Sequence, residues 1–431
     1  VRCLLSAKSR LVPSDLNMTS DTSIAQSLPV IGGPERDNHN KFTGAHAPLQ
    51  QNLVKQSTIH GLYLHTPFCF HKCHYCDFYS IVEAGDTDRQ AAFVDRLIAE
   101  LRHRAGQFGR LRPRTIFVGG GTPTLLRQPL WRRLLDALRD LGCLDQVTEF
   151  TVEANPETVT DGLMDTLVAG GVNRVSLGAQ SFQPALLKTL ERWHEPASVV
   201  RAVHTVRDAG IDNINLDLIF GIPGQTMAML DADLRAVLDL GPTHLSCYGL
   251  TYEPNTAMTQ RLRQGQITPA DEDLERDMYD RVMTQLETAG FEHYEVSNWV
   301  QPGHRCEHNL IYWTNQNWLA VGPSGASHVA GWRWKNIAHL GRYLAQQPEP
   351  PVVDVEHLPA ARQVGEMLML GLRLREGVPV SWLDEYVPTT DPRRTTIREL
   401  TALGLLEATD AHLRLTRRGL FVADSVIAKL L

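Results

Sequence analysis

The sequence predicts an α/β protein whose main part is a partial, laterally open (β/α)6 barrel, similar to part of a TIM barrel. Three observations predict it: short β-forming runs, helical stretches between those runs, and polar residues where the runs end. Strand and helix alternating along a chain are typical of parallel βα units. The runs are GLYLHTPF (61–68), TIFVGGG (115–121), EFTVEANP (149–156), RVSLGAQS (174–181), INLDLIFG (214–221) and HLSCYGLTYE (244–253).

The polar strand ends favour a barrel over an open, doubly wound sheet. A barrel gathers the carboxyl ends of its parallel strands on one face, and such folds carry their sites there. Groups that could take part in chemistry end most runs: His65, the glycines 119–121, Glu153, Gln180 and Asp217. Because six βα units are fewer than the eight of a closed barrel, we expect the barrel to be open at its side.

The segments between the runs have helical periodicity. Val94, Leu97, Ile98 and Leu101 occupy positions i, i+3, i+4 and i+7, which is one apolar face of a helix. We therefore assign residues 61–255 to the barrel.

Two further parts are predicted after the barrel. Residues 256–350 form an aromatic-rich α+β extension with a helix at 270–290, and Pro348, Pro350 and Pro351 mark a linker at its end. Residues 360–431 form a winged-helix-like module. Its expected elements are helices at 361–374, 381–386, 393–403 and 416–430 and a hairpin in LLEATDAHLRL. The excess of arginine over acidic residues in this module is too small to indicate nucleic-acid binding, so a structural or docking role is expected.

Residues 1–60 are predicted to form a poorly ordered N-terminal extension, since they are polar and lack sustained periodicity. Arg2, Lys8 and Arg10 resemble the start of a transit peptide, but acidic residues soon follow, from Asp15 onward. We therefore expect a cytoplasmic protein.

Composition excludes several classes of protein. The chain has 431 residues, 43% of them hydrophobic and 21% charged, which is ordinary globular composition. Its formal charge of -7 argues against a general nucleic-acid binder. No apolar run approaches the roughly 20 residues of a membrane-spanning helix, although peripheral membrane contact is not excluded.

The chain has seven cysteines, an odd and sparse set for a disulfide framework. Cys69, Cys73 and Cys76 stand together in a C-x3-C-x2-C spacing that lets three thiolates converge on one soft metal centre. Three thiolates on a cubane cluster would leave one iron without a protein ligand. A zinc site that recruits His71 or His74 as its fourth ligand is the main alternative, and a chance grouping is the remaining one.

This loop after the first strand resembles the signature of the radical S-adenosylmethionine (SAM) superfamily, and the resemblance extends over residues 61–431. It implies a barrel of the radical SAM type with a [4Fe-4S] cluster on Cys69, Cys73 and Cys76. It also implies that SAM chelates the fourth iron.

The resemblance further implies a set of cofactor contacts. The positions that match cofactor contacts in the related coproporphyrinogen oxidases are Tyr63, Gly120, Gly121, Thr122, Glu153, Gln180, Arg192 and Asp217. Thr251 falls at another such position but differs in residue type. An arginine can clamp a carboxylate in a bidentate manner, and carboxylates can accept from an amine or from ribose hydroxyls.

Two groups within the superfamily compete. The oxygen-independent coproporphyrinogen III oxidases, which decarboxylate a porphyrin precursor, usually continue the loop to a fourth cysteine, whereas this chain has Asp77-Phe78. The run His308-Asn309-Leu-Ile-Tyr312-Trp313 matches the H-N-x-x-Y-W motif of the HemW-type haem chaperones. The resemblance therefore implies a chaperone that binds a cluster, SAM and haem and passes haem to an acceptor protein.

Histidine is a normal axial ligand of haem, so His308 is the candidate ligand, with an aromatic core position as the alternative. Whether the protein is also an enzyme is left open, with the oxidase as the second hypothesis. A zinc-stabilised regulatory protein is the third hypothesis.

Overall fold

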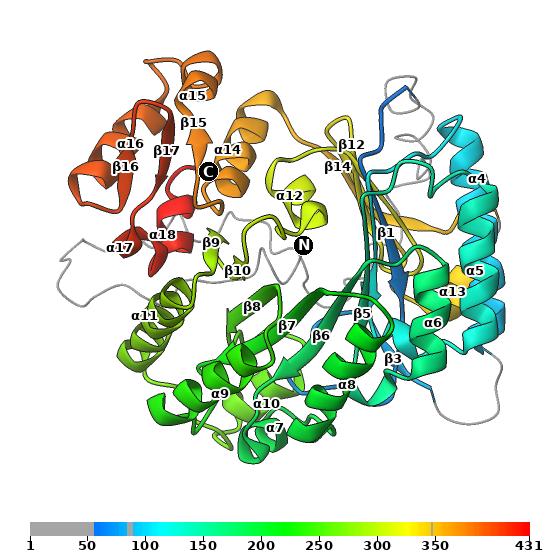
Figure 1. The fold of residues 1–431 in the computed structure, drawn as a ribbon. Coiled ribbons are helices and arrows are strands. Elements are labelled where there is room, and N and C mark those ends of the chain that lie inside the picture. The colour runs from blue at the N-terminus through cyan, green and yellow to red at the C-terminus, as the bar shows by residue number, and fades with distance from the viewer. Residues whose placement is uncertain (1–55, 84–88, 346–347) are drawn as a thin grey trace.

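The structure, a computed structural model of the chain, describes residues 56–83, 89–345 and 348–431. The N-terminal extension expected over residues 1–60 therefore lies outside the described residues, except from residue 56 onward. The ordered chain forms a curved sheet with helices on its outer side, followed by a small C-terminal module (Figure 1).

The predicted barrel strands are all present and run parallel in one sheet. Their spatial order follows their order along the chain. The partial barrel predicted from the sequence is thus confirmed. The strands are β1 (Gly61–Thr66), β4 (Thr115–Gly120), β5 (Glu149–Ala154), β6 (Arg174–Gln180), β7 (Asn213–Phe220) and β8 (His244–Gly249).

Helices cover the outer face of this sheet, as Figure 1 shows on the right and below. The apolar positions predicted in the first of them are buried: Leu97 and Leu101 have no exposed surface. Burying such a stripe against the sheet is what stabilises an amphipathic helix. The helices are α4 (Arg89–Gln107), α5 (Gln128–Asp140), α6 (Asp161–Ala169), α7 (Pro184–Thr189), α8 (Pro196–Asp208) and α9 (Met227–Asp239), with short 3-10 turns at Pro123–Leu125 and Pro156–Thr158.

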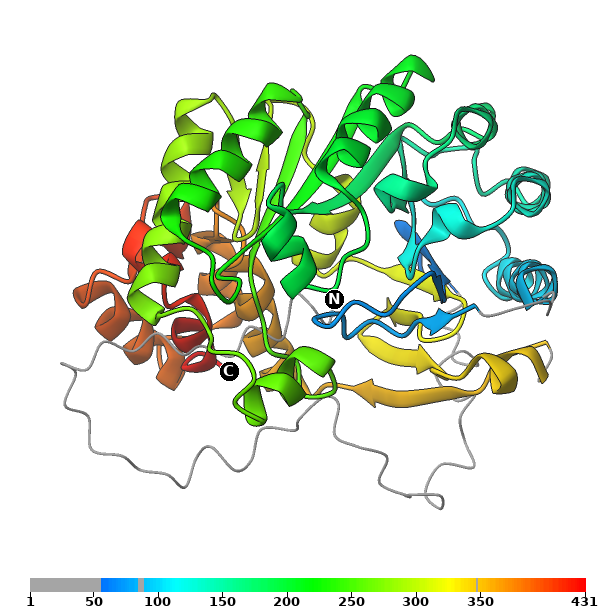
Figure 2. The same cartoon turned by 90° about the horizontal axis from the view of Figure 1, so that it is seen from below.

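The extension continues the barrel sheet at both edges, an arrangement that no pattern in the sequence predicts. On one side β11 (Trp318–Val321) pairs in parallel with β1 and is followed by the antiparallel strands β12 (Ala326–Val329), β13 (Trp332–Asn336) and β14 (Val352–His357). In Figure 2 these yellow and orange strands lie beside the blue strand β1. On the other side β10 (Asn298–Val300) and β9 (Glu292–Glu295) follow β8. Since β9 and β14 are the two edge strands of the described sheet and do not pair with each other, the barrel is laterally open.

The helices of the extension lie around this enlarged sheet. The predicted helix at 270–290 is present as α11 (Glu272–Thr288). The others are α10 (Ala257–Arg263), α12 (Glu307–Trp313) and α13 (Leu340–Ala345).

The C-terminal module contains the elements predicted for it, although its identity as a winged helix stays a prediction. Strand β15 (Val378–Pro379) joins the hairpin β16 (Leu406–Ala408) and β17 (His412–Leu415). The expected last helix is divided in two. The helices are α14 (Ala360–Gly371), α15 (Val380–Tyr386), α16 (Pro392–Ala402), α17 (Arg417–Leu420) and α18 (Ala423–Ala428).

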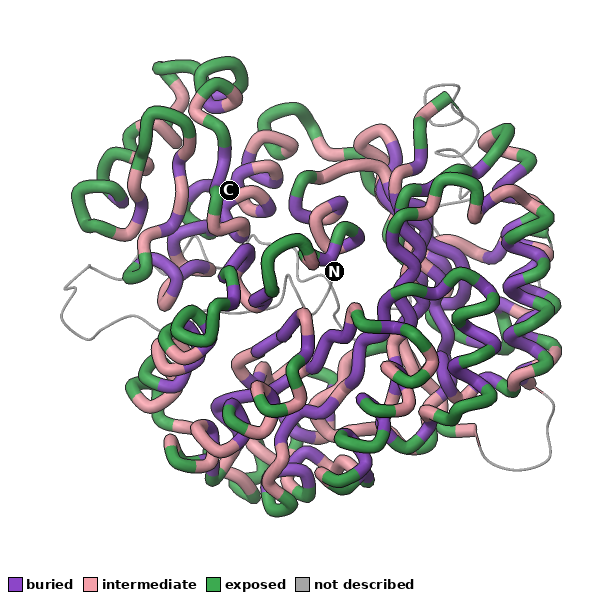
Figure 3. The backbone as a smooth tube through the Cα atoms, viewed as in Figure 1, coloured by how far each residue is buried: buried purple, intermediate pink, exposed green. Residues whose placement is uncertain are grey.

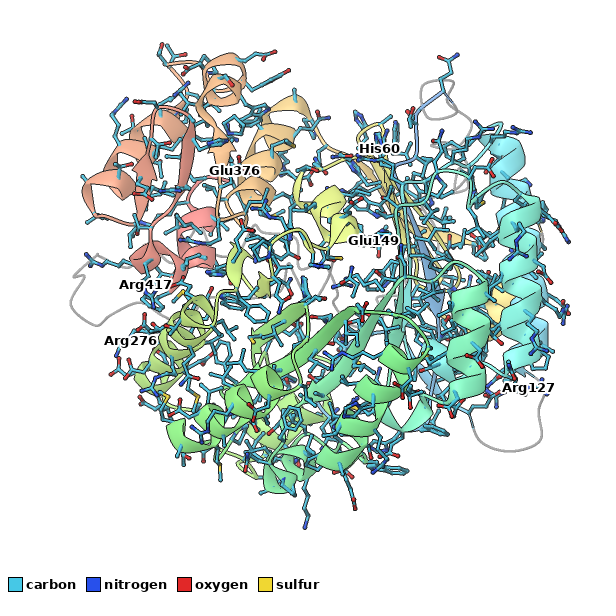
Figure 4. The ribbon with its side chains drawn as sticks, viewed as in Figure 1. His60, Arg127, Glu149, Arg276, Glu376 and Arg417 are labelled. Carbon is cyan, nitrogen blue, oxygen red and sulfur yellow. The ribbon has the colours of Figure 1, made fainter. Side chains whose placement is uncertain are left out.

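Polar contacts fix this module to the rest of the chain. Arg417, labelled in Figure 4, donates to Asp280 of α11 at 2.8 Å. The backbone of Arg373 accepts from Val296 and that of Arg375 donates to Tyr294, each at 3.0 Å. The module therefore covers the β9 edge of the sheet.

Burial divides each barrel strand into two faces. The purple strands in Figure 3 form the interior of the molecule, with green, exposed turns on the helices outside. On β6, Val175 and Leu177 point into the core under the helices, whereas Arg174 and Ser176 alternate with them and face the barrel interior. No helix among the described residues is both long and apolar enough to cross a lipid bilayer.

Candidate cluster and cofactor site

The three clustered cysteines lie in the loop that follows β1. The loop begins at β2 (Phe68–Cys69) and returns at β3 (Ile81–Val82), and the two short strands pair in parallel. Cys69, Cys73 and Cys76 are free thiols of intermediate burial. The loop sits at the carboxyl end of β1, as the sequence predicted.

Two polar side chains from other strands reach the thiols. Thr122, after β4, donates from its hydroxyl to the Cys69 Sγ at 3.6 Å. The guanidinium of Arg192 approaches the Cys73 Sγ at 3.7 Å. Burial raises the pKa of Cys69 and raises that of Cys76 to about 12. A metal centre would overcome this cost, since a coordinating thiol is deprotonated by the positive charge of the metal.

This donor set fits an iron–sulfur cluster. Three unpaired soft thiols in one loop, flanked by an arginine, supply anionic ligands and a compensating charge. In the described parts of the chain, no three or more His, Cys, Asp or Glu side chains, the three cysteines included, converge tightly enough to hold a single metal ion. His71 stacks on Trp193 with ring centroids 4.5 Å apart and has a buried Nε2 without a partner, and His74 bonds to Arg261. These contacts do not by themselves distinguish zinc from an iron–sulfur cluster.

The glycine turn after β4 is shaped around the site. Gly120 has φ of +103°, and a Cβ there would lie 2.4 Å from the ring of His65. A Cβ on Gly121 would lie 2.5 Å from the carbonyl oxygen of Phe68. Only glycine meets both demands. The Gly121 N–H donates to the Thr66 carbonyl at 2.7 Å, which holds the turn against the cysteine loop.

Two carboxyl groups face the barrel interior beside this turn. Glu153 on β5 accepts from the Gly120 N–H at 3.1 Å, and Asp217 on β7 accepts from the Asn215 amide at 2.7 Å. Burial, together with the negative charge of Asp217, raises the pKa of Glu153 to about 7. Burial likewise raises the pKa of Asp217. These acceptors face the side from which a ligand amine or hydroxyl could donate.

Gln180 and Arg192 complete the group from β6 and the segment after α7. Gln180 has φ of +66°, at a bulge where β6 shifts register against β7. Arg192 donates to the Gly178 carbonyl at 2.6 Å, and its buried Nε has no partner. That Arg192 donor remains free for a ligand carboxylate.

Tyr63 on β1 also faces this interior, where burial and then Glu153 raise its pKa. The structure thus brings all the cofactor contacts implied by the resemblance to the carboxyl end and middle of the barrel, around the cysteine loop. Their roles as ligand contacts stay predictions.

His308 lies elsewhere, at the amino end of the strands. Its Nδ1 bonds to Thr115 at 2.7 Å and its Nε2 to Tyr312 at 2.8 Å, and its ring is fully buried and stacks on Phe117. Burial lowers its pKa to about 3. Because both nitrogens are already bonded, haem ligation would require this arrangement to open, so the ligand role stays a prediction.

The residues at the amino end of the barrel strands, which form the floor of the barrel, were not predicted from the sequence. Glu149, labelled in Figure 4, faces the start of α12 and accepts from the N–H groups of Glu307 at 2.8 Å and His308 at 3.1 Å. Arg174 on β6 and His244 on β8 are buried on the same floor. The sequence did carry one signal for these residues. Polar residues at every second position of a strand, such as Glu149, Thr151 and Glu153, indicate a polar strand face that is directed into the barrel.

Family comparisons agree with this architecture. A barrel of parallel strands with a three-cysteine loop after its first strand defines a radical SAM protein. The Radical SAM superfamily profile matches residues 63–237, and the HemN C-terminal domain profile matches residues 358–422.

Curated relatives named heme chaperone HemW cover most of the chain. The protein from Lactococcus lactis is 36% identical, over 86% of this chain and 96% of its own. The one from Mycobacterium tuberculosis is 37% identical over 86% and 94%, and that from Escherichia coli 34% over 85% and 97%. The chain belongs to the HemW family.

Among solved structures, the coproporphyrinogen III oxidase HemN from Escherichia coli has the same fold. The TM-score is 0.77 at 21% identity, covering 90% of this chain and 93% of that one. Both its barrel and its C-terminal part are thus represented here. As a member of the radical SAM superfamily, the chain has the [4Fe-4S] cluster and SAM as its cofactors, and bound together these supply reductive radical chemistry.

Proposed function

We propose that this protein is a haem chaperone, which binds haem and passes it to an acceptor protein. The observation that carries the proposal is the similarity to HemW proteins along nearly their whole length, 94% to 97% in the relatives described above. The residue pair Asp77-Phe78, where the oxidases usually have a fourth cysteine, supports a carrier over an oxidase.

We assign a separate role to each of the three parts of the chain. Residues 61–255 would hold the cluster through Cys69, Cys73 and Cys76, and SAM through the interior groups. Residues 256–350 would complete the barrel floor and contribute to haem binding. Residues 360–431 would serve as a structural or docking module, since several arginines there are already paired, including Arg393 with Asp391.

The test is anaerobic cluster reconstitution followed by two parallel assays. Haem binding is followed by the Soret band, and coproporphyrinogen conversion by product analysis. Stoichiometric haem binding without conversion is the expected result, and catalytic conversion would contradict the carrier function.

A matched pair of variants tests the cluster assignment. Cys73→Ser should lose the iron and the brown colour of the reconstituted protein, because a three-thiolate site cannot lose a ligand without losing the cluster. Cys143→Ser changes a fully buried thiol outside the loop and should retain both. Unchanged iron content in Cys73→Ser would overturn the ligand assignment.

We further propose that the protein acts in the cytoplasm, with peripheral contact to the membrane when the acceptor lies there. Flotation of haem-loaded protein with zwitterionic phospholipid vesicles tests this contact, since a chain of formal charge -7 is not drawn to an anionic surface. Co-migration with the vesicles is expected of peripheral binding, and recovery of all the protein in the soluble fraction would contradict it.

A further inference from the structure

Arg174 is a buried arginine that makes no direct ion pair with any described residue. It is the first residue of β6, points into the barrel and is 2% exposed. Among the described residues it makes one hydrogen bond, a long one from Nη1 to the Thr151 hydroxyl at 3.4 Å, and its buried Nε has no partner. Within the described residues, no carboxylate lies within ion-pair distance of Arg174.

Of the other buried arginines in the described chain, Arg104 and Arg373 lie against carboxylates and Arg96 does not. Arg96 donates to the Tyr343 carbonyl at 3.1 Å and lies over the Tyr343 ring, while its two terminal nitrogens have no partner. Arg104 approaches the carboxylates of Glu100 and Glu349, and Arg373 bonds to Asp424 at 2.9 Å. Burial disfavours the charge of Arg174, but Cys306, Glu149 and other neighbours raise its pKa overall. What Arg174 lacks is therefore a well-placed hydrogen-bond acceptor rather than compensation of its charge.

The acids nearest to Arg174 are engaged elsewhere. Glu149 accepts two backbone N–H groups of α12 and the thiol of Cys306 at 3.4 Å. Asp217 accepts from Asn215, whose oxygen in turn bonds to His244 at 2.7 Å. These bonds connect the strands at the floor of the barrel. They leave the buried Nε of Arg174 as a donor on this floor without an acceptor.

Residues that face the interior further along the strands keep some exposed surface, namely Tyr63, Phe117, Glu153, Gly178 and Asp217. A ligand that reaches the floor would pass these side chains. An anionic group is the partner that a guanidinium selects.

We propose that Arg174 binds a carboxylate of the ligand held inside the barrel, and that this carboxylate is a propionate of haem. The inference rests on the proposed haem-chaperone function. The carboxylate of SAM is the other source, but Arg174 and Gln180 begin and end β6, about 20 Å apart at about 3.3 Å per residue. A SAM molecule chelating the cluster lies at the far end of the strand, where Arg192 is available to it.

The test compares haem with haem dimethyl ester, in which both propionates are neutral. The wild-type protein should bind the ester about 10- to 100-fold more weakly, the usual value of a hydrogen bond to a charged group. Arg174→Gln should weaken haem binding by a similar factor and bind the two ligands equally. Arg373→Gln, which removes a buried arginine from the module contact, should keep the wild-type preference.

The outcomes separate this proposal from the proposed function. If the wild-type protein binds haem and its ester equally, Arg174 is not a propionate receptor, although the chaperone function stands. If it binds no haem, both fail. If Arg174→Gln weakens SAM binding and leaves haem unchanged, the carboxylate belongs to SAM and the proposal is overturned. Should Arg174→Gln fail to fold, the wild-type comparison decides by itself.

Discussion

Glu153→Gln should stabilise the protein at alkaline pH, because Glu153 is held in an environment that disfavours its charge. The carboxyl has an ordinary pKa of 4.5, and in the folded chain burial and then Asp217 raise the pKa to about 7. Each pH unit between the two values contributes about 1.4 kcal/mol, so the full penalty of ionisation is about 3 kcal/mol. The side chain keeps some contact with interior solvent, which makes this an upper limit.

The sign of the pH dependence follows from where the proton is held. Between pH 4.5 and about 7 the folded state binds a proton at Glu153 that the unfolded state has lost, so stability falls as the pH rises through this window. Glutamine cannot ionise. The free energy of unfolding that Glu153→Gln gains over wild type should therefore be near zero at pH 4.5. It should reach its full value above about pH 7.

The assay is the unfolding temperature of both proteins without SAM at a series of pH values. Glu195→Gln is the matched control, since it removes the same charge from an exposed position. SAM affinity should fall in Glu153→Gln while the free protein becomes more stable, a trade of stability for function. A loss of stability at alkaline pH, or a gain that does not change with pH, would refute the reasoning.

Three further predictions concern the architecture of the site. Gly120→Ala should cost about 1–3 kcal/mol of stability and weaken SAM binding, because its Cβ would meet His65 at a positive φ; an unchanged unfolding temperature would contradict this. Glu149→Ala should cost about 3 kcal/mol or more, since it leaves two N–H groups of α12 without acceptors; the midpoint of urea unfolding measures the loss. His308→Ala should lower stability, because it removes the hydrogen bond between His308 and Thr115. Thr115→Val removes the same bond and serves as the control. Only a loss of haem affinity in His308→Ala that exceeds the loss in Thr115→Val would support a ligand role for His308.

The barrel and its cysteine loop could be predicted because their signals are local. A β-forming run followed by a helical period is readable within a short window, and so is the C-x3-C-x2-C spacing. The grouping of Glu153 and Asp217 with the other predicted cofactor contacts could also be predicted, because the carboxyl ends of parallel strands share one face.

The floor of the barrel was not predictable in this way. His308 stood out in the sequence because of its aromatic neighbours, yet its position beneath β1 and β4 depends on the pairing of β11 with β1 and on the cap that Glu149 provides for α12. Arg174 carried no motif. The absence of a direct ion pair at Arg174 became visible only when the surrounding acids proved to be bonded to other groups.

The sequence by itself determined the class of fold, the grouping of the three candidate cluster cysteines and the direction in which the strand ends face, because chain period and residue spacing encode these features. The tertiary structure decided how the extension continues the sheet, where His308 lies and that Arg174 makes no direct ion pair with a described residue. These depend on contacts between residues far apart in the chain, such as Thr115 with His308 and Glu149 with α12. No local pattern specifies such contacts, since they arise only when distant strands are brought side by side.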